Sequence, residues 1–329
     1  MIEISIIKHY YFDMKKYGLP YKGSKNKLAE RILDIFPQKE NLYDLFCGGG
    51  AISHCALLGN KFKKVYMNDI NPMCTQLFVD SAKGKYHNET RWISRDDFYR
   101  LKDIDPYVAF CWSFGNNCRD YLYAQDLEPY KKAWHYALFF SDYTEAKKLL
   151  NEKIDEIDVE KDFYKKYLLS KKYVKQDSRL QNLERLQRLQ NLERLQSLQN
   201  LERLQRLQSL ERLERLERLE TSCKSFDEVE IKPNSIIYCD IPYFNTNSYG
   251  KKNKNTFDYE CFYDWCKKQK ELVFISSYEM PDDFIELTMG SFSHNSTLCA
   301  TANKKVVEKI FIPKHQLELY EENNTTLFV

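Results

Sequence analysis

Residues 236–243 carry the most distinctive chemical pattern of this chain, an apolar run ending in Asp240 and followed by Ile241, Pro242 and Tyr243. A carboxylate, a backbone carbonyl and an aromatic ring in one short run can hold the exocyclic amine of a nucleobase. The Asp240 carboxylate and the Ile241 carbonyl would accept the two N–H groups, and the Tyr243 ring would stack on the extruded base. Pro242 would stiffen the loop. The alternative is an ordinary strand-to-loop exit.

A second candidate centre is the run DLFCGGG at residues 44–50. Glycines at a sharp turn from strand to helix let the backbone approach a ligand, and the helix N-terminus favours an anionic group. The spacing does not match the GxGxxG dinucleotide fingerprint. Asp69 follows the glycines by about 20 residues, at a predicted strand end where an acid can hydrogen-bond ribose hydroxyls. The alternatives are a plain tight turn and a solvated acid.

The elements that position these residues alternate between strand and helix. Residues 41–46 and 64–67 are predicted strands, and residues 51–58 between them are a predicted helix, so they form a βαβ unit with parallel strands. An earlier helix at residues 28–33 ends before Pro37. Further strands are predicted at residues 235–239, 271–276 and 306–313. We therefore predict an α/β fold with a Rossmann-like sheet that is interrupted by an insertion and completed after it.

The insertion changes character along its length. Residues 91–178 are rich in Tyr, Trp, Phe and Lys and are predicted to be a mostly helical recognition region. The predicted catalytic domain comprises residues 14–90 and 221–320, with a low-complexity leucine repeat at 179–220 between the insertion and the second part. Met14 could itself be a start, so residues 1–13 are interpreted as an extension.

Leucine recurs at every third position from Leu180 to Leu219. Leu, Glu, Gln and Arg all favour helix, so a helix is predicted. Leucines at this spacing wind around an α-helix, which excludes a heptad seam. A spacer or packing helix, self-association and DNA contact remain alternatives for its role. Unless the repeat mediates self-association, the protein is expected to be a monomer.

Bulk composition limits the function classes. The 329 residues carry a net charge of +2, so nucleic-acid binding would have to rest on local patches. The ten cysteines include no CxxC pair and no zinc spacing, and no metal is expected. No secretory signal and no apolar run of about 18 residues occurs, so a cytoplasmic protein without a membrane span is expected.

Together these runs resemble the Dam-like, or D12 class, DNA adenine N6-methyltransferases, especially phage-borne members. The resemblance covers most of residues 17–313, except the repeat, and rests on four motifs in the family's order. It implies that the chain transfers a methyl group from S-adenosylmethionine to adenine N6 in double-stranded DNA. The implied catalytic residues are Asp240, Ile241, Pro242 and Tyr243. The implied cofactor-binding residues are Tyr21, Lys22, Gly23, Lys25, Asp44, Phe46, Cys47, Gly48, Gly49, Asp69, Ser225 and Phe226.

One residue departs from the family pattern: Ile241 stands where the family has a proline. The resemblance implies that this residue acts through its carbonyl, so activity should survive with some loss of preorganisation. Aspartate at the first motif position favours adenine N6 over cytosine N4. The chain also lacks the Pro-Cys pair of a cytosine-C5 enzyme, and no covalent enzyme intermediate is expected.

Target recognition in this family lies between the ribose acid and the catalytic run. Asn116, Asn117 and Arg119 are therefore candidates for base-edge or phosphate contacts, or alternatively surface polar residues. Two other functions are alternatives. A catalytically silent regulator is suggested by Ile241 and the repeat, and a dehydrogenase by the βαβ unit, although the missing GxGxxG counts against the latter. No nuclease motif is visible, so the sequence leaves a partner restriction enzyme open.

Overall fold

The computed structural model describes residues 17–86, 88–150, 216–242, 257–287, 292–295 and 305–325. By their contacts the described residues divide into two compact units. One contains residues 17–84 together with those from 216 onward, and the other contains residues 85–150. The first unit holds the sheet and the predicted catalytic run.

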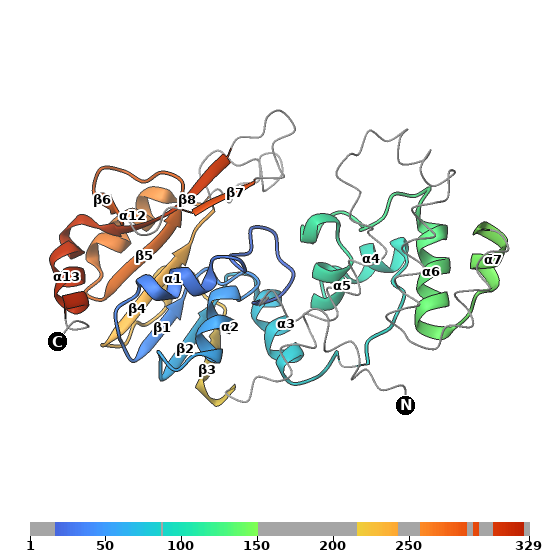
Figure 1. The fold of residues 1–329 in the computed structure, drawn as a ribbon, viewed down its shortest axis with the longest axis horizontal. Helices are drawn as coiled ribbons and strands as arrows, with labels where there is room; N and C mark the ends of the chain where they lie inside the picture. The colour runs from blue at the N-terminus through green and yellow to red at the C-terminus, as the bar shows by residue number, and fades with distance from the viewer. Residues whose placement is uncertain are drawn as a thin grey trace. The chain divides into compact units, whose positions relative to one another are not determined.

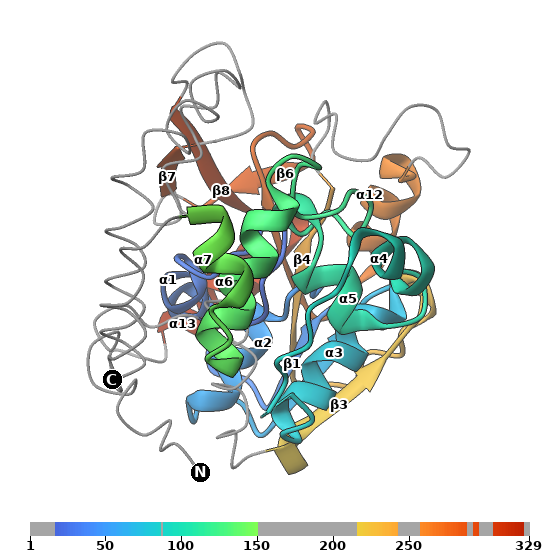
Figure 2. The same cartoon turned by 90° about the vertical axis from the view of Figure 1, so that its right-hand side faces the viewer.

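The sheet of the first unit is mixed but mainly parallel (Figures 1 and 2). Its strands lie in the order β3-β2-β1-β4-β5-β8-β6, and β7 pairs with β8. The parallel strands are β1 (Asn41–Asp44), β2 (Lys64–Asn68), β3 (Leu219–Ser222), β4 (Ser235–Asp240) and β5 (Leu272–Ser277). The antiparallel strands are β6 (Phe284–Glu286), β7 (Phe292–Asn295) and β8 (Lys305–Pro313). The predicted Rossmann-like α/β class is confirmed.

The central strands are apolar because both faces of the sheet are covered. Every residue of β1 and β5 is buried, and so is all of β4 except its last residue, Asp240. Near-continuous apolar runs are typical of such doubly covered parallel strands. The five strands predicted from the sequence are all present, with boundaries that differ by one or two residues.

β3 was not predicted, and it corrects the helix prediction at the end of the leucine repeat. Leu216–Arg218 is a 3-10 turn (η5), and Leu219 then pairs in parallel with Val65 of β2. Arg218 holds the start of β3 by donating to the carbonyls of Leu57, Gly59 and Phe62, in the last turn of α2 and the segment that follows it. The last residues of the repeat favour helix by composition, but backbone pairing with β2 and the hydrogen bonds of Arg218 outweigh this propensity. Residues 180–215 of the repeat lie outside the described residues, so its role stays a prediction.

Helices cover both faces of the sheet. On one face Phe36, just after α1, contacts Tyr238 and Phe274, and Tyr320 of α13 contacts Phe274 from the same side. On the other face Phe262 of α12 joins a cluster with Tyr43 and other strand residues. The helices of this unit are α1 (Ala29–Ile35), α2 (Ala51–Leu58), α3 (Pro72–Ala82), α12 (Tyr259–Lys268) and α13 (Leu317–Thr325). The helices predicted at 28–33 and 51–58 are confirmed.

The second unit is helical as far as it is described, as predicted for this part of the chain. Its elements are α4 (Arg95–Leu101), α5 (Pro106–Cys111), the 3-10 turn η2 (Phe114–Asn116), α6 (Glu128–Phe140) and α7 (Thr144–Leu150). Ser94 and Asp105 cap α4 and α5 by accepting hydrogen bonds from backbone N–H groups of the first turn. The remainder of the predicted region, residues 151–178, lies outside the described residues.

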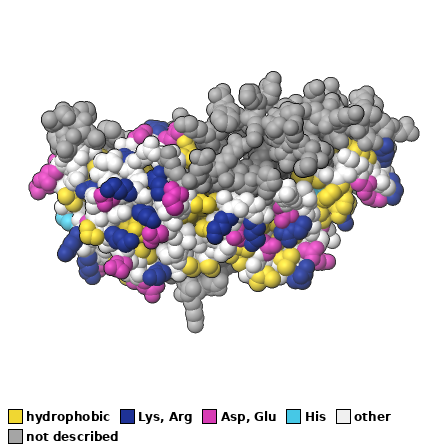
Figure 3. Space-filling model, turned by 90° about the horizontal axis from the view of Figure 1, so that it is seen from below, with side chains coloured by type: hydrophobic (Ala, Val, Ile, Leu, Met, Phe, Trp, Pro, Cys, Tyr) yellow, Lys and Arg dark blue, Asp and Glu magenta, His cyan; other side chains and the backbone are white. Residues whose placement is uncertain are grey.

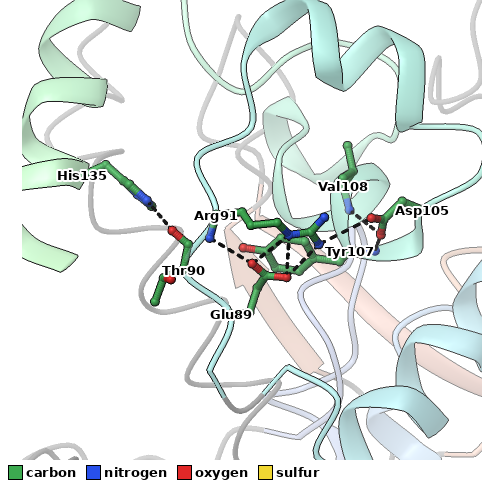
Figure 4. Close-up of polar contacts among 7 residues, drawn as sticks. All are labelled: Glu89, Thr90, Arg91, Asp105, Tyr107, Val108 and His135. Carbon is green, nitrogen blue, oxygen red and sulfur yellow. Dashed lines mark hydrogen bonds and ion pairs between the residues drawn. The ribbon is translucent and has the colours of Figure 1, made fainter. Parts of the chain in front are cut away.

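Polar contacts hold the entry into this unit (Figure 4). The Arg91 guanidinium pairs with Glu89 at 2.7 Å and Asp105 at 3.5 Å and lies over the Tyr107 ring. His135 of α6 hydrogen-bonds the Thr90 carbonyl at 2.7 Å. Arg91 is therefore engaged by two carboxylates and is poorly suited to bind a phosphate.

The described surface has no large excess of one charge on the face seen in Figure 3, where basic and acidic side chains alternate. No helix among the described residues is long and apolar enough to cross a membrane. The same residues contain no group of three or more His, Cys, Asp or Glu side chains that could hold a metal ion.

Candidate active site

Three aspartates lie at the carboxyl ends of neighbouring strands. Asp44 ends β1, Asp69 directly follows β2, and Asp240 ends β4. In the sheet, β2 and β3 lie on one side of β1, whereas β4 and β5 lie on its other side. Such a reversal of strand order is where open α/β sheets bind ligands. The fold therefore gathers the two sequence motifs at one edge of the sheet.

The glycine turn is closely covered by the segment before α1. A Cβ on Gly48 would lie 2.6 Å from the Tyr21 ring, and one on Gly49 would lie 2.9 Å from the Leu19 carbonyl oxygen. Gly48 also has a φ of +48°, which disfavours any other residue. Leu19 N–H donates to the Gly49 carbonyl at 2.6 Å. Tyr21 thus belongs to the wall of the glycine turn.

Asp69 supports the same turn. Its Oδ2 accepts from Gly48 N–H at 2.8 Å and its Oδ1 from Asn71 N–H at 2.9 Å. Burial raises the pKa of Asp69, and these two hydrogen bonds oppose the rise. Each oxygen keeps a further lone pair that can accept a hydroxyl. The next residue, Ile70, is 76% exposed, and no sequence pattern indicated this apolar surface.

Asp44 and Cys47 are buried behind the turn. The Asp44 carboxylate accepts from Ser53 Oγ at 2.7 Å and Ser53 N–H at 3.2 Å, so it ties β1 to helix α2. Burial raises the pKa of Asp44 to about 7. Burial also raises the pKa of the Cys47 thiol well above its usual range, which keeps this thiol protonated and unreactive. The observed contacts of both side chains are structural.

Asn68 brings two aromatic residues together at the ends of β1 and β3. Its side-chain amide donates to the carbonyls of Leu45 and Lys224, both at 3.0 Å, and accepts from Lys224 N–H. Phe46 directly follows Leu45, and Phe226 lies two residues after Lys224. The rings of Phe46 and Phe226 stack with centroids 5.7 Å apart. Ser225 starts the turn at Phe226 through a capping box with Glu228. The sequence motif named Asp69, but it gave no sign of this linking role for Asn68.

Asp240 is held by Lys25. The Lys25 ammonium donates to both carboxylate oxygens at 2.7 Å, and a second carboxylate, Glu308 on β8, lies 3.4 Å away. Burial favours the neutral amine of Lys25, but the two carboxylates outweigh it and raise the pKa of Lys25 above its usual value. Lys22 and Gly23 form the turn that precedes Lys25. Lys25 therefore contacts the predicted catalytic carboxylate, a pairing that the sequence did not indicate.

The rest of the catalytic run is partly described. The Ile241 side chain is 3% exposed and packs in the apolar cluster that includes Phe262. The Pro242 carbonyl accepts from the Tyr259 hydroxyl at 2.8 Å, which fixes the start of the loop. Tyr243 lies outside the described residues, so its stacking role stays a prediction.

The candidate DNA-contacting residues lie in a loop of the second unit. The Asn116 side chain donates to the Phe110 carbonyl at 2.7 Å. The Asn117 side chain accepts from the N–H groups of Arg119 and Asp120, at 2.9 and 3.0 Å. Both asparagines therefore shape the loop. The Arg119 guanidinium is exposed beside Asp120, and Phe114, which no sequence pattern singled out, is 53% exposed in the same loop.

Comparison with known proteins identifies the family. The family model described as D12 class N6 adenine-specific DNA methyltransferase matches residues 21–272, which is more than half of the chain. A search of curated proteins found no match. The matched range includes the glycine turn, Asp69, and the Asp240 run. The chain therefore belongs to the D12 class of N6 adenine-specific DNA methyltransferases, enzymes that methylate adenine in DNA with S-adenosylmethionine.

Proposed function

We propose that this enzyme methylates adenine N6 at a specific sequence in double-stranded DNA, with Asp240 as the group that accepts an N–H of the target amine. The observation that carries the proposal is the position of Asp240 at the strand-order switch beside the glycine turn. Its side chain is 21% exposed, whereas its partner Lys25 is 6% exposed. The carboxylate is therefore the member of the pair that a substrate can reach.

The residues around the glycine turn fit S-adenosylmethionine by their chemistry. Asp69 has lone pairs for ribose hydroxyls, and the exposed Ile70 together with Phe46 and Phe226 offers apolar surface for an adenine ring. Gly48 and Gly49 let Leu19 and Tyr21 pack directly on the backbone that leads into α2, so this turn is compact where the cofactor would bind. When bound, this cofactor supplies an electrophilic methyl group on a sulfonium sulfur. Asp44 and Cys47 would support the turn from behind.

The catalytic run would act on the target amine directly. The lone pair of an exocyclic amine is delocalised into the base, so the nitrogen becomes nucleophilic only when its N–H groups are drawn toward acceptors. The Asp240 carboxylate and the Ile241 carbonyl would accept these two N–H groups, and Tyr243 would stack on the base after it leaves the duplex. A carbonyl is all that is required of residue 241, so isoleucine can replace the family's proline.

DNA would be contacted by the loop of the second unit. Arg119 and Phe114 are exposed and offer a cation and a flat ring, while Asn116 and Asn117 hold the loop that presents them. A salt bridge as exposed as Arg119–Asp120 contributes little, so a phosphate can compete for the guanidinium. We propose Arg119 as a phosphate or base-edge contact on this basis.

The test is incubation of double-stranded DNA with methyl-labelled cofactor, followed by digestion to nucleosides. We expect label in N6-methyl-2′-deoxyadenosine and loss of transfer in Asp240→Ala, with cofactor binding largely retained. Asp264→Ala is the matched control because Asp264 is an exposed aspartate of α12 paired with Lys267. Label in 4-methylcytosine, or full activity of Asp240→Ala, would contradict the proposal. Binding of cofactor and DNA without turnover would indicate a regulator.

A further inference from the structure

Glu308 is a buried carboxylate whose charge lies beside the predicted catalytic pair. In the strand registers Asp240 lies opposite Ser276, and Ser276 lies opposite Ile310. Side chains two residues apart point to the same face of a sheet, so Glu308 lies on the face that carries Asp240. Lys25 approaches this face from the segment before α1 and reaches both carboxylates.

The exposures of the three side chains form a gradient. Glu308 is 2% exposed, Lys25 6% and Asp240 21%. The Lys25 ammonium thus faces the carboxylates of both Asp240 and Glu308. Charges in such a buried setting interact strongly, because water screens them little. Asp240 is the member of the three that is most exposed to solvent.

An isolated Lys25–Asp240 pair would be poorly suited to catalysis. A lysine ammonium at hydrogen-bond distance from both oxygens of a carboxylate neutralises much of its charge and weakens it as an acceptor for a neutral amine. A second carboxylate on the inner side of Lys25 offsets this effect, because it competes for the same ammonium. Glu308 occupies this inner position.

We propose that Glu308 is a positioning residue for methyl transfer: it shares the Lys25 ammonium and so preserves the power of Asp240 to accept an N–H of the target amine. This inference rests on the proposed role of Asp240. Glu308 touches neither substrate nor cofactor in this scheme and acts only through Lys25.

The first test is Glu308→Gln, which keeps the shape of the side chain and removes its charge. We expect kcat to fall about tenfold, within the range of coupling between contacting residues, with KM for DNA and cofactor changed less than twofold. The acidic limb of the kcat profile should move to lower pH, because a negative charge that favours protonation of its neighbours is gone. Among the described residues, Tyr238 and Cys239 on β4 and Asp44 on β1 are further ionisable groups that interact electrostatically with Asp240. Glu308→Asp should recover part of the rate.

Glu286→Gln is the matched control, because it removes the carboxylate of the more exposed Lys309–Glu286 ion pair, which joins β8 to β6 at 2.8 Å. It should leave kcat and the pH profile unchanged. Thermal unfolding and binding of S-adenosylhomocysteine, measured for each variant, separate misfolding from a catalytic effect. A folded Glu308→Gln enzyme with normal kcat and an unmoved acidic limb would overturn the proposal.

A double-mutant cycle tests whether Glu308 acts through Lys25. If it does, Glu308→Gln should have little further effect on kcat in a Lys25→Met background. Effects that multiply independently would contradict the inference. Asp240→Ala distinguishes this failure from failure of the proposed function: if that variant is inactive while Glu308→Gln is normal, only the role of Glu308 is lost. If Asp240→Ala is fully active, the proposed function itself fails.

Discussion

The Nδ1 atom of His54 in α2 accepts a hydrogen bond from the Gly18 N–H at 2.9 Å. This contact ties the segment carrying Tyr21 and Lys25 to the helix that follows the glycine turn. The imidazole is 4% exposed and lies edge-on to the rings of Tyr17 and Phe78. Only the unprotonated Nδ1 can accept this hydrogen bond.

This relationship predicts a pH-dependent stability. Burial lowers the pKa of His54 from 6.5 to about 4. The folded state favours neutral His54, so its contribution is fully present above pH 6.5 and is lost as pH falls toward 4. The loss should reach up to about 3 kcal/mol. His54→Asn keeps a hydrogen-bond acceptor but does not titrate. The wild type should therefore have the higher unfolding free energy at pH 7, and its advantage over His54→Asn should shrink as the pH falls to 4.5. Equal pH slopes in the two proteins would rule out this role.

Asp44 should give the opposite pH dependence. Burial raises the pKa of this carboxyl from 3.8 to about 7, so folding favours its protonated form. Its favourable contribution is present below pH 3.8 and is lost as pH rises through 7. Asp44→Asn keeps an acceptor for Ser53 without the charge. The change in unfolding free energy caused by Asp44→Asn should be more favourable at pH 8 than at pH 5, by roughly 1–4 kcal/mol.

The same variant separates the two roles of Asp44. If the residue only supports the turn, calorimetric binding of S-adenosylhomocysteine should change little. A large loss of affinity in a stable Asp44→Asn protein would indicate a direct cofactor contact, as the family resemblance implies.

The parts of the candidate site that local sequence patterns determine could be predicted, whereas contacts between residues far apart in the sequence could not. β1, α2, β2 and β4 follow from local apolar patterns and the glycine turn, and their ends place Asp44, Asp69 and Asp240 at one edge. Lys25 and Asp240 are 215 residues apart, and only the folded sheet brings them together. β3 was missed because its pairing with β2 depends on an available edge, not on the residues at 219–222. Asn116 and Asn117 have the composition of a base-contacting pair, yet their hydrogen bonds within the loop could not be derived from it.

Gly48→Ala should disrupt the cover over the glycine turn. The new Cβ would meet the Tyr21 ring at 2.6 Å, and the residue would keep an unfavourable φ. We expect a loss of about 1–3 kcal/mol in unfolding free energy and weaker cofactor binding. Adding Tyr21→Ala should recover the part of the stability loss that arises from the clash.

Gly59→Ala is the control for that pair. Its Cβ would have no neighbour closer than 3.7 Å, so the unfolding free energy should change by less than about 1 kcal/mol. If Gly48→Ala is as mild as Gly59→Ala, Tyr21 does not pack against the turn in solution.

Ile241→Pro tests the residue that departs from the family motif. The chemistry requires only the carbonyl of residue 241, so the methylation rate should stay within a few-fold or rise through a stiffer loop. The isoleucine side chain, however, is buried in the cluster with Phe262, and a proline ring fills less of that space. We therefore expect the unfolding free energy to fall by about 1 kcal/mol while kcat is kept. Single-turnover rates and denaturant unfolding of the same preparation separate the two effects. A collapse of the rate in a folded variant would mean that the loop after Asp240 is built differently from the family's, and that the Ile241 carbonyl does not face the target amine.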